Sequence, residues 1–431
     1  MLTALVASDA GEIFELDGYA AVGMAGAKLA PLTVAQTRRL PFGSELMMLP
    51  DRKPVLLNID TGKLETLHEN PYDPGEMVYP VAAFNSPGYV ITRISAYGET
   101  RRSQTLPLFS YGAVGWHADG FRSAVVQVDA EPRQDLRQMP RDEVIAGVER
   151  MRRQMPDNRL RAHLENCALT YGCPAGKNFF LGRYEAPLPT AQACNARCLG
   201  CLSLQQNSDI HHSQDRIAFT PSPQEIAEVA LAHITQVDGS VVSFGQGCEG
   251  DPLLADHVIG PAIEQIRSQT DRGTINMNTN GSLPDRLPSL FDAGLDSIRI
   301  SMNSVRKACY DAYFRPRGYG FADVLASIET ALARKKFVAV NYLNCPGFSD
   351  TPAEAAALEQ FLEQYPIHMI QWRNLNFDPV RYWRQMDAAA SSGEPIGMEV
   401  LLKQIRQRFP NLKFGYFNPP KEKFSYHHRD H

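Results

Sequence analysis

Three cysteines within eight residues constrain this 431-residue chain more than any other feature of its sequence. They are Cys194, Cys198 and Cys201, and their neighbours are Asn, Arg and Gly rather than a run of apolar residues. A cubane iron–sulfur cluster normally takes four protein thiolates, so a tight loop that offers three leaves one iron open to another ligand. The spacing therefore predicts a [4Fe–4S] cluster with one coordination position at which a cofactor can bind.

Two other interpretations of these cysteines compete with the cluster. A structural zinc site needs four ligands, usually supplied in two pairs, and His211 or His212 could complete one. Free buried thiols are the second alternative, although this polar loop does not resemble core packing. The sequence that follows the loop favours the cluster.

Downstream of the cysteines, short apolar runs alternate with amphipathic stretches, which is the pattern of βα units around a parallel sheet. Helical patterns cover residues 323–332 and 353–365. A first strand is expected just before Cys194, and five more are expected at residues 241–244, 274–277, 297–300, 338–343 and 369–372. The sequence thus predicts an α/β fold with about six βα repeats.

Small polar residues follow each expected strand. The first such turn, residues 245–252, is rich in glycine and carries the carboxylates Glu249 and Asp251. We call it the Gly/acid turn. Glycine lets the backbone approach a ligand closely, and carboxylates accept hydrogen bonds from an ammonium group. The other turns begin at Asn278, Ser301, Asn344 and Arg373. In parallel barrels the chemistry gathers where strands end, so these residues are expected around one site.

The cysteine loop, the Gly/acid turn and the polar strand ends follow one another as they do in the radical S-adenosylmethionine (radical SAM) superfamily, which residues 186–375 resemble. The resemblance implies a partial (β/α)6 TIM-like barrel. It also implies that Cys194, Cys198 and Cys201 bind the cluster, while the amino and carboxylate groups of SAM chelate the open iron. The cofactors implied are therefore a [4Fe–4S] cluster and SAM.

The same resemblance implies which residues contact SAM. The turn looks like the family's Gly-Gly-Glu-Pro region, which binds the methionine amino group, and either Glu249 or Asp251 is the equivalent carboxylate. Leu343 falls where the family packs on adenine, and Gly200 stands where the family usually has an aromatic residue whose backbone meets the adenine. The full set of implied SAM contacts is Gly200, Gly247, Glu249, Gly250, Asp251, Asn278, Asn280, Ser301, Asn303 and Leu343.

In this family a reduced cluster cleaves SAM to a 5′-deoxyadenosyl radical that abstracts hydrogen from the substrate, and the protein must enclose that reaction. The resemblance therefore implies an enzyme with an electron donor such as a flavodoxin or ferredoxin. We expect the substrate to be a macromolecule or peptide, with RNA considered because arginines crowd residues 150–161. A small metabolite of cofactor biosynthesis is the alternative, and a non-catalytic, metal-stabilised binding module is the third hypothesis.

The remaining cysteines raise the question of a second cluster. Cys167 and Cys173, together with Cys248 or Cys345, could ligate an auxiliary iron–sulfur cluster, although packing thiols explain them as well. Cys345 is a candidate catalytic residue, because it follows an expected strand at the barrel mouth and could donate hydrogen to a product radical. Cys309 is expected to be a packing residue.

We divide the chain into four segments. Residues 1–135 hold short β-like runs and form a β-rich domain that recognises substrate or acts as a lid. Residues 136–185 form a helical connector whose arginines, balanced by glutamates, make a solvated helix face or a phosphate-binding patch. Residues 186–375 form the barrel. Residues 376–431 form a C-terminal extension whose terminal histidines are expected to be solvated.

Composition limits the cellular setting. The formal net charge of −5 gives no general attraction to nucleic acid or anionic membranes, and no apolar run could span a bilayer. The first residues lack the pattern of a signal peptide. Eight cysteines, three of them in a cluster motif, indicate a reducing compartment. We therefore expect a cytoplasmic protein without a membrane partner.

Overall fold

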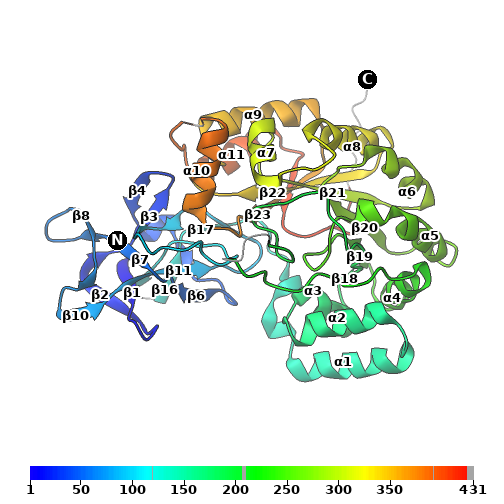
Figure 1. Cartoon of the computed structure of the whole chain (residues 1–431), viewed down its shortest axis with the longest axis horizontal. Coiled ribbons are helices and arrows are strands. Elements are labelled where there is room, and N and C mark those ends of the chain that lie inside the picture. The colour runs from blue at the N-terminus through cyan, green and yellow to red at the C-terminus, as the bar shows by residue number, and fades with distance from the viewer. Residues whose placement is uncertain (119, 206–209, 392, 425–431) are drawn as a thin grey trace.

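A computed structural model describes residues 1–118, 120–205, 210–391 and 393–424 of the chain. It shows a strand-rich N-terminal part beside a larger α/β part, with three helices between them in the sequence (Figure 1). The C-terminal histidines, expected to be solvated, lie outside the described residues. No helix of the described chain is long and apolar enough to cross a membrane.

The N-terminal part consists of antiparallel strand pairs, which confirms its predicted β-rich character. Its largest sheet has ten strands, and the buried strand β1 (Thr3–Ala7) pairs with three neighbours. The other strands of that sheet are β2 (Ile13–Ala20), β5 (Arg38–Arg39), β6 (Glu45–Met48), β7 (Arg52–Asn58), β8 (Leu64–Thr66), β11 (Tyr79–Phe84), β14 (Tyr97–Glu99), β15 (Val114–His117) and β16 (Gly120–Ser123). Smaller sheets are formed by β3 (Val22–Ala25), β4 (Lys28–Pro31) and β13 (Ile94–Ser95), by β9 (Glu69–Asn70) and β10 (Asp73–Met77), and by β12 (Tyr89–Ile91) and β17 (Val125–Gln127).

Three helices follow: α1 (Arg141–Gln154), α2 (Arg159–Leu169) and α3 (Pro174–Leu181). The side chain of Asn158 caps α2 by accepting from the N–H of Arg161. Three arginines of this segment are ion-paired: Arg152 and Arg161 contact Glu165, and Arg159 contacts Glu225. This pairing favours the solvated helix face over the phosphate-binding patch.

The α/β part is built on one fully parallel sheet of seven strands in sequence order, which confirms the predicted partial barrel. The first six strands are those expected from the sequence. The strands are β18 (Glu185–Pro187), β19 (Val241–Phe244), β20 (Thr274–Thr279), β21 (Ser297–Met302), β22 (Phe337–Asn344), β23 (Met369–Asn374) and β24 (Lys413–Gly415). The seventh, β24, lies in the segment expected to be a C-terminal extension.

Helices pack along the outside of this sheet and bury apolar side chains against it (Figure 1). The first, α4, starts with a capping box in which Ser222 and Glu225 satisfy each other's backbone N–H groups. The helices are α4 (Pro223–Gln236), α5 (Asp256–Arg267), α6 (Leu287–Ala293), α7 (Lys307–Phe314), α8 (Phe321–Ala333), α9 (Pro352–Gln364), α10 (Pro379–Ala389) and α11 (Met398–Arg408).

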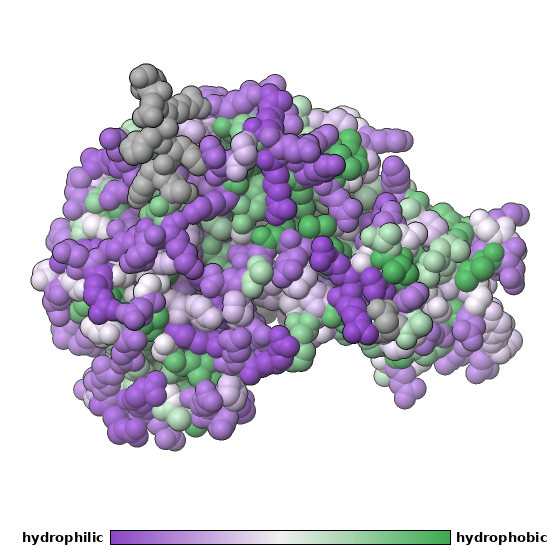
Figure 2. Space-filling model, turned by 180° about the vertical axis from the view of Figure 1, so that it is seen from behind, coloured by the Kyte–Doolittle hydropathy of each residue, from purple (hydrophilic) through white to green (hydrophobic). Residues whose placement is uncertain are grey.

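The N-terminal part is fixed to the carboxyl end of β23 and to the start of α10. The side chain of Asn374 both accepts from the N–H of Ile91 and donates to the carbonyl of Tyr89, each at 2.9 Å. Arg52 forms a buried ion pair of 3.0 Å with Asp378, which caps α10. Seen from behind, the surface is hollowed between the two parts, and hydrophobic side chains lie in the hollow (Figure 2).

Candidate functional site

A cavity of about 690 Å³ lies where the strands of the barrel end and the N-terminal part begins. Its walls come from every segment of the chain. Phe84 and Phe109 belong to the N-terminal part, Tyr171 and Cys173 to the helical connector, and Tyr416 to the segment after β24. The strand ends supply the rest of the lining, as expected for a parallel barrel.

The cysteine loop forms one side of this cavity. Cys194 and Cys198 line it, whereas Cys201 lines an adjoining cavity of about 590 Å³ that also reaches Cys198. Backbone hydrogen bonds seat the loop on α7, from Arg197 to the carbonyl of Phe314 and from Leu199 to that of Tyr313. The loop is therefore held by the barrel rather than free on the surface.

The three thiols suit a multi-iron cluster better than a single zinc ion. Their sulfurs do not all lie within 4.8 Å of one another, whereas two sulfurs on one tetrahedral zinc are about 3.8 Å apart. Burial and then the charge of Asp251 raise the pKa of Cys194 to about 11, and burial and then the charge of Cys194 raise the pKa of Cys198 well above its ordinary value. Buried thiols of this kind lose their protons when a cation replaces them.

The histidines that could have completed a zinc site point elsewhere. His211 and His212 are exposed, and the His212 ring pairs with Asp215 at 2.9 Å. Cys201 instead receives a hydrogen bond from Arg216 at 3.6 Å, a contact that stabilises a thiolate. The donor set fits a [4Fe–4S] cluster held by Cys194, Cys198 and Cys201.

The carboxylate of Glu249 is fully engaged by the protein. One oxygen accepts from the backbone N–H groups of Thr190 and Ala191, and the other accepts from those of Gly245 and Gln246, at 2.7–2.8 Å. Burial raises the pKa of Glu249 to about 7, while these four donors act in the opposite direction. Four N–H donors use every acceptor position of an ionised carboxylate, so this side chain holds the turn together.

The carboxylate of Asp251 differs because it retains an acceptor position and lines the cavity. It accepts from the N–H of Leu253 and the hydroxyl of Thr279 through one oxygen, and from the N–H of Asn280 through the other. Burial raises the pKa of Asp251 to about 6. Of the two carboxylates proposed from the sequence, Asp251 is therefore the one that can still accept a hydrogen bond from a ligand.

Two glycines bring the turn against its neighbours. A Cβ on Gly250 would lie 1.8 Å from the carbonyl oxygen of Ala193, just before the cysteine loop. A Cβ on Gly245, whose φ is +80°, would lie 1.7 Å from the carbonyl oxygen of Asn278. Only glycine fits both positions, which places the Gly/acid turn between the cysteine loop and β20.

The other residues expected to contact SAM divide into two groups. Gly247, Asn278, Asn280, Ser301 and Leu343 line the cavity together with Gly250 and Asp251. Gly200 and Asn303 are absent from its lining. Gly200 is buried against Tyr313 and Asn376, and the Asn303 amide donates to Tyr382 and to the carbonyl of Cys309.

Cys345, the candidate catalytic cysteine, lies at the end of β22 but is sealed beneath the N-terminal part. Its side chain is 1% exposed and borders a void of only about 10 Å³, together with Ile91 and Tyr111. Burial raises the pKa of its thiol well above the ordinary value. This environment favours the packing alternative for Cys345.

Two arginines of the cavity were given no role from the sequence, although Arg373 was expected at the end of a strand. Arg299 on β21 and Arg373 on β23 both donate to the side chain of Gln371, and neither forms an ion pair with a described carboxylate. Burial and then the charge of Arg373 lower the pKa of Arg299 to about 9. Side chains of a strand alternate between its faces, so Arg299 shares the inner face with Ser301, which could have revealed it.

Comparison with known proteins identifies the domain. Residues 188–358 match the family model described as the radical SAM superfamily. The chain is 24% identical over 298 residues to molybdenum cofactor biosynthesis protein 1 of Bos taurus, covering 59% of this chain and 42% of that protein. It is 30% identical over 125 residues to the GTP 3′,8-cyclase of Mycobacterium marinum, covering 28% and 32%, respectively. The chain thus spans less than half of the length of these curated relatives.

Similar solved structures include HydG, described as a maturase of the [FeFe]-hydrogenase, with a TM-score of 0.38, 13% identity and coverage of 65% of each chain. Another is SuiB of Streptococcus suis bound to S-adenosylmethionine, with a TM-score of 0.37 and 15% identity. That match covers 54% of this chain and 49% of SuiB.

Proposed function

We propose that this protein, whose residues 188–358 form a radical SAM domain, cleaves SAM reductively and acts on an anionic small molecule. Enzymes of this family use a [4Fe–4S] cluster and SAM. One observation carries the proposal: two cluster cysteines, the Gly/acid turn and the polar strand ends all line a single cavity. When bound, the cluster and SAM supply a 5′-deoxyadenosyl radical for hydrogen abstraction.

The residues of the chain hold and orient these groups. Cys194, Cys198 and Cys201 supply the three thiolates of the cluster. Asp251 offers its remaining acceptor position to the SAM ammonium, and a charge-assisted hydrogen bond of this kind fixes orientation as well as affinity. Asn278, Asn280, Ser301 and Leu343 complete the SAM site from neighbouring strands.

The substrate class follows from the charge of the cavity. Arg299 and Arg373 are guanidinium groups without a carboxylate partner in the described chain, and the Nε atoms of both are buried without a hydrogen-bond acceptor. An anion can satisfy such donors, because guanidinium groups bind phosphate and carboxylate in a bidentate manner. These donors favour an anionic substrate, and a cavity of about 690 Å³ has the size of a small-molecule site, which supports the metabolite hypothesis.

The named relatives suggest which anion to try first. Several are GTP 3′,8-cyclases, so we propose a nucleotide as the first probe for this cavity. A reduced flavodoxin or ferredoxin stays our prediction for the electron donor.

The SAM cleavage is tested with anaerobically reconstituted protein, dithionite and SAM, by measuring 5′-deoxyadenosine. We expect product from the wild type and from Cys309→Ala, a control cysteine buried in α7 away from the cavity. Cys194→Ala, Cys198→Ala and Cys201→Ala should each yield none. Product formation by a variant that lacks all three cysteines would refute the proposal.

The substrate class is tested by titrating GTP into the reconstituted protein with SAM present. Arg373→Gln should weaken GTP binding at least about tenfold, because it removes a charged donor from the cavity. Arg272→Gln is the matched control, since Arg272 is exposed and pairs with Asp238. If GTP and other nucleotides do not bind, while a peptide or RNA copurifies, the metabolite hypothesis is wrong.

A further inference from the structure

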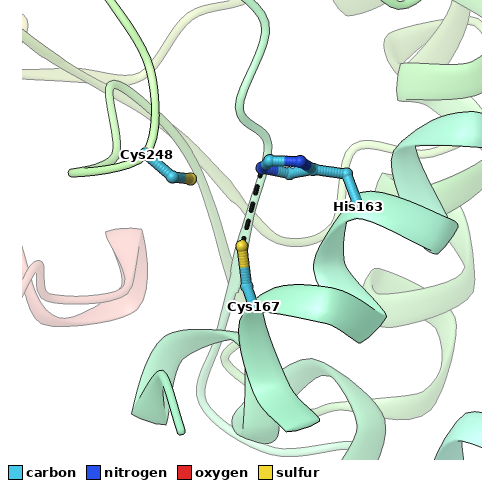
Figure 3. Close-up of side chains that lie close together, drawn as sticks. All are labelled: His163, Cys167 and Cys248. Carbon is cyan, nitrogen blue, oxygen red and sulfur yellow. Dashed lines mark hydrogen bonds between the residues drawn. The ribbon is translucent and has the colours of Figure 1, made fainter. Parts of the chain in front are cut away.

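A second set of metal-ligating side chains lies outside the cluster loop. His163 and Cys167 are one turn apart on α2, and Cys248 lies in the Gly/acid turn, where it faces them across the gap (Figure 3). Their ligand atoms all lie within 4.8 Å of one another, and the His163 Nε2 atom is 3.5 Å from the Cys167 sulfur. Across residues 1–118, 120–205, 210–391 and 393–424, no other three such side chains come so close.

Both elements that carry these ligands are fixed. Helix α2 is capped by Asn158 and tied to α4 through the ion pair between Arg159 and Glu225. The backbone of the turn is held by the Glu249 carboxylate, and the carbonyl of Cys248 accepts from Ile217 at 2.8 Å. Cys167 and Cys248 are only 2% and 6% exposed. The two thiols are therefore shielded from water, and the half-buried His163 completes a preorganised set.

We propose that His163, Cys167 and Cys248 bind one thiophilic divalent transition-metal ion, with zinc as the expected ion. Around tetrahedral zinc, a sulfur and an imidazole nitrogen lie about 3.6 Å apart and two sulfurs about 3.8 Å apart. The observed 3.5 Å between the His163 Nε2 atom and the Cys167 sulfur agrees with the first value, and the other two separations are at most 4.8 Å. Two thiolates and a neutral imidazole also balance the charge of a divalent ion, so a buried site need not carry net charge.

The half-buried Cys173 would have to move to become the fourth ligand, because its sulfur does not lie within 4.8 Å of all three ligand atoms. Its N–H donates to the carbonyl of Cys167 at 2.9 Å, which places it beside the three ligands. Cys173 also lines the main cavity. A metal ion here would join the helical connector to the turn that carries Asp251, and would thereby stabilise the turn.

A single ion fits these residues better than an auxiliary iron–sulfur cluster. A cluster distributes its cysteine ligands over different irons, which separates their sulfurs more widely than one ion does. A disulfide between Cys167 and Cys248 is the other competing outcome. Both alternatives are distinguishable from a bound ion by experiment.

The test uses the full chain with Cys194, Cys198 and Cys201 all changed to alanine, so that its result does not depend on the [4Fe–4S] cluster. Purified with zinc and dialysed, this variant should retain about one zinc per chain by mass spectrometry. Adding Cys167→Ser or His163→Ala should lower the zinc content at least about tenfold. Adding Cys309→Ser, the matched control, should leave it unchanged.

Cobalt provides a readout that does not depend on the stability of these variants. Cobalt bound to the triple alanine variant should give thiolate-to-metal charge transfer and the intense d–d bands of tetrahedral geometry. Zinc retention that is unchanged in Cys167→Ser, absence of both zinc and cobalt, a Cys167–Cys248 disulfide in anaerobic preparations, or iron with equimolar sulfide would each overturn the proposal.

Discussion

At the scale of single residues, the carboxylates of Glu249 and Asp251 have different roles although they lie in the same turn. Four backbone N–H groups converge on Glu249 and leave it no acceptor position. Asp251 accepts from three donors and keeps one position that opens on the cavity. The first side chain shapes the turn, and the second can bind a ligand.

Asp251→Asn should weaken SAM binding by at least about tenfold, because a charge-assisted hydrogen bond to the ammonium becomes a neutral one. The iron content should stay at the wild-type value. Calorimetric titration of SAM, combined with iron analysis, checks both expectations. Wild-type SAM affinity in Asp251→Asn would contradict the assignment.

Glu249→Gln is the matched comparison, and it should act on stability. Its amide group would face two backbone N–H donors, and each donor left unsatisfied costs about 1–3 kcal/mol. Thermal unfolding should therefore show a lower Tm for Glu249→Gln than for Asp251→Asn. Equal Tm values for the two variants would show that Glu249 does not hold the turn.

The sequence identifies residues well where a spacing rule or a family motif applies, as for Cys194, Cys198 and Cys201. It gives no role to Arg299 or to the strand-end residue Arg373, because that role depends on which face of the sheet lines the cavity. Cys345 shows that a correctly predicted position does not predict the environment of a side chain. Its place at a strand end was predictable, but its burial under the N-terminal part depends on contacts that are distant in the chain.

At the scale of elements, the contact between α2 and α4 positions His163 and Cys167, the two proposed zinc ligands on α2. Arg159 on α2 donates to both carboxylate oxygens of Glu225, which is also part of the capping box of α4. The hydrogen bond from Arg159 lowers the pKa of Glu225 to about 2. The ionised carboxylate thus stabilises the packing contact between α2 and α4.

This lowered pKa predicts a pH dependence. The stability that Glu225 contributes should be fully present above its unfolded pKa of about 4.3 and should be lost as the pH falls toward 2. Glu225→Gln should lower Tm by about 2–4 °C at pH 7, and the difference from the wild type should shrink below pH 4.5. A difference in Tm that stays constant from pH 7 to pH 3.5 would be the contrary result.

The elements of the barrel were predictable to different degrees. Five strands, β19 to β23, are apolar runs bounded by turns, and the structure has them where the sequence places them. The first, β18, has the sequence Glu-Ala-Pro and was expected only as a strand before Cys194. Strand β24 was not identified, because it has only three residues, Lys413–Gly415, and no apolar run. It pairs with β23 because the parallel sheet offers an unpaired edge there, which is a tertiary effect.

At the scale of the whole molecule, the N-terminal part closes the barrel mouth, and the pair of Arg52 and Asp378 fixes it there. Both side chains are buried, and Asp378 also accepts from the N–H of Leu106 and caps α10. Removal of one partner leaves the other charge buried and unpaired. The N-terminal part therefore contributes both cavity wall and enclosure.

Arg52→Ala should destabilise the protein by about 3–5 kcal/mol, because Asp378 would then be an uncompensated buried charge. Arg384→Ala is the matched control, since Arg384 also joins α10 to the N-terminal part, through Glu99, but is exposed. It should cost about 0.2–1 kcal/mol. Urea unfolding of the two variants gives both values, and equal losses would contradict the role of the buried pair.

The central claim is that three thiolates hold a four-iron cluster whose open iron meets SAM inside the cavity. Electron paramagnetic resonance of the dithionite-reduced, reconstituted protein tests it most directly, with and without SAM. We predict a [4Fe–4S] signal that changes when SAM is added, that is lost in Cys198→Ala, and that responds to SAM more weakly in Asp251→Asn. A reconstituted wild-type cluster whose signal is indifferent to saturating SAM would contradict the account.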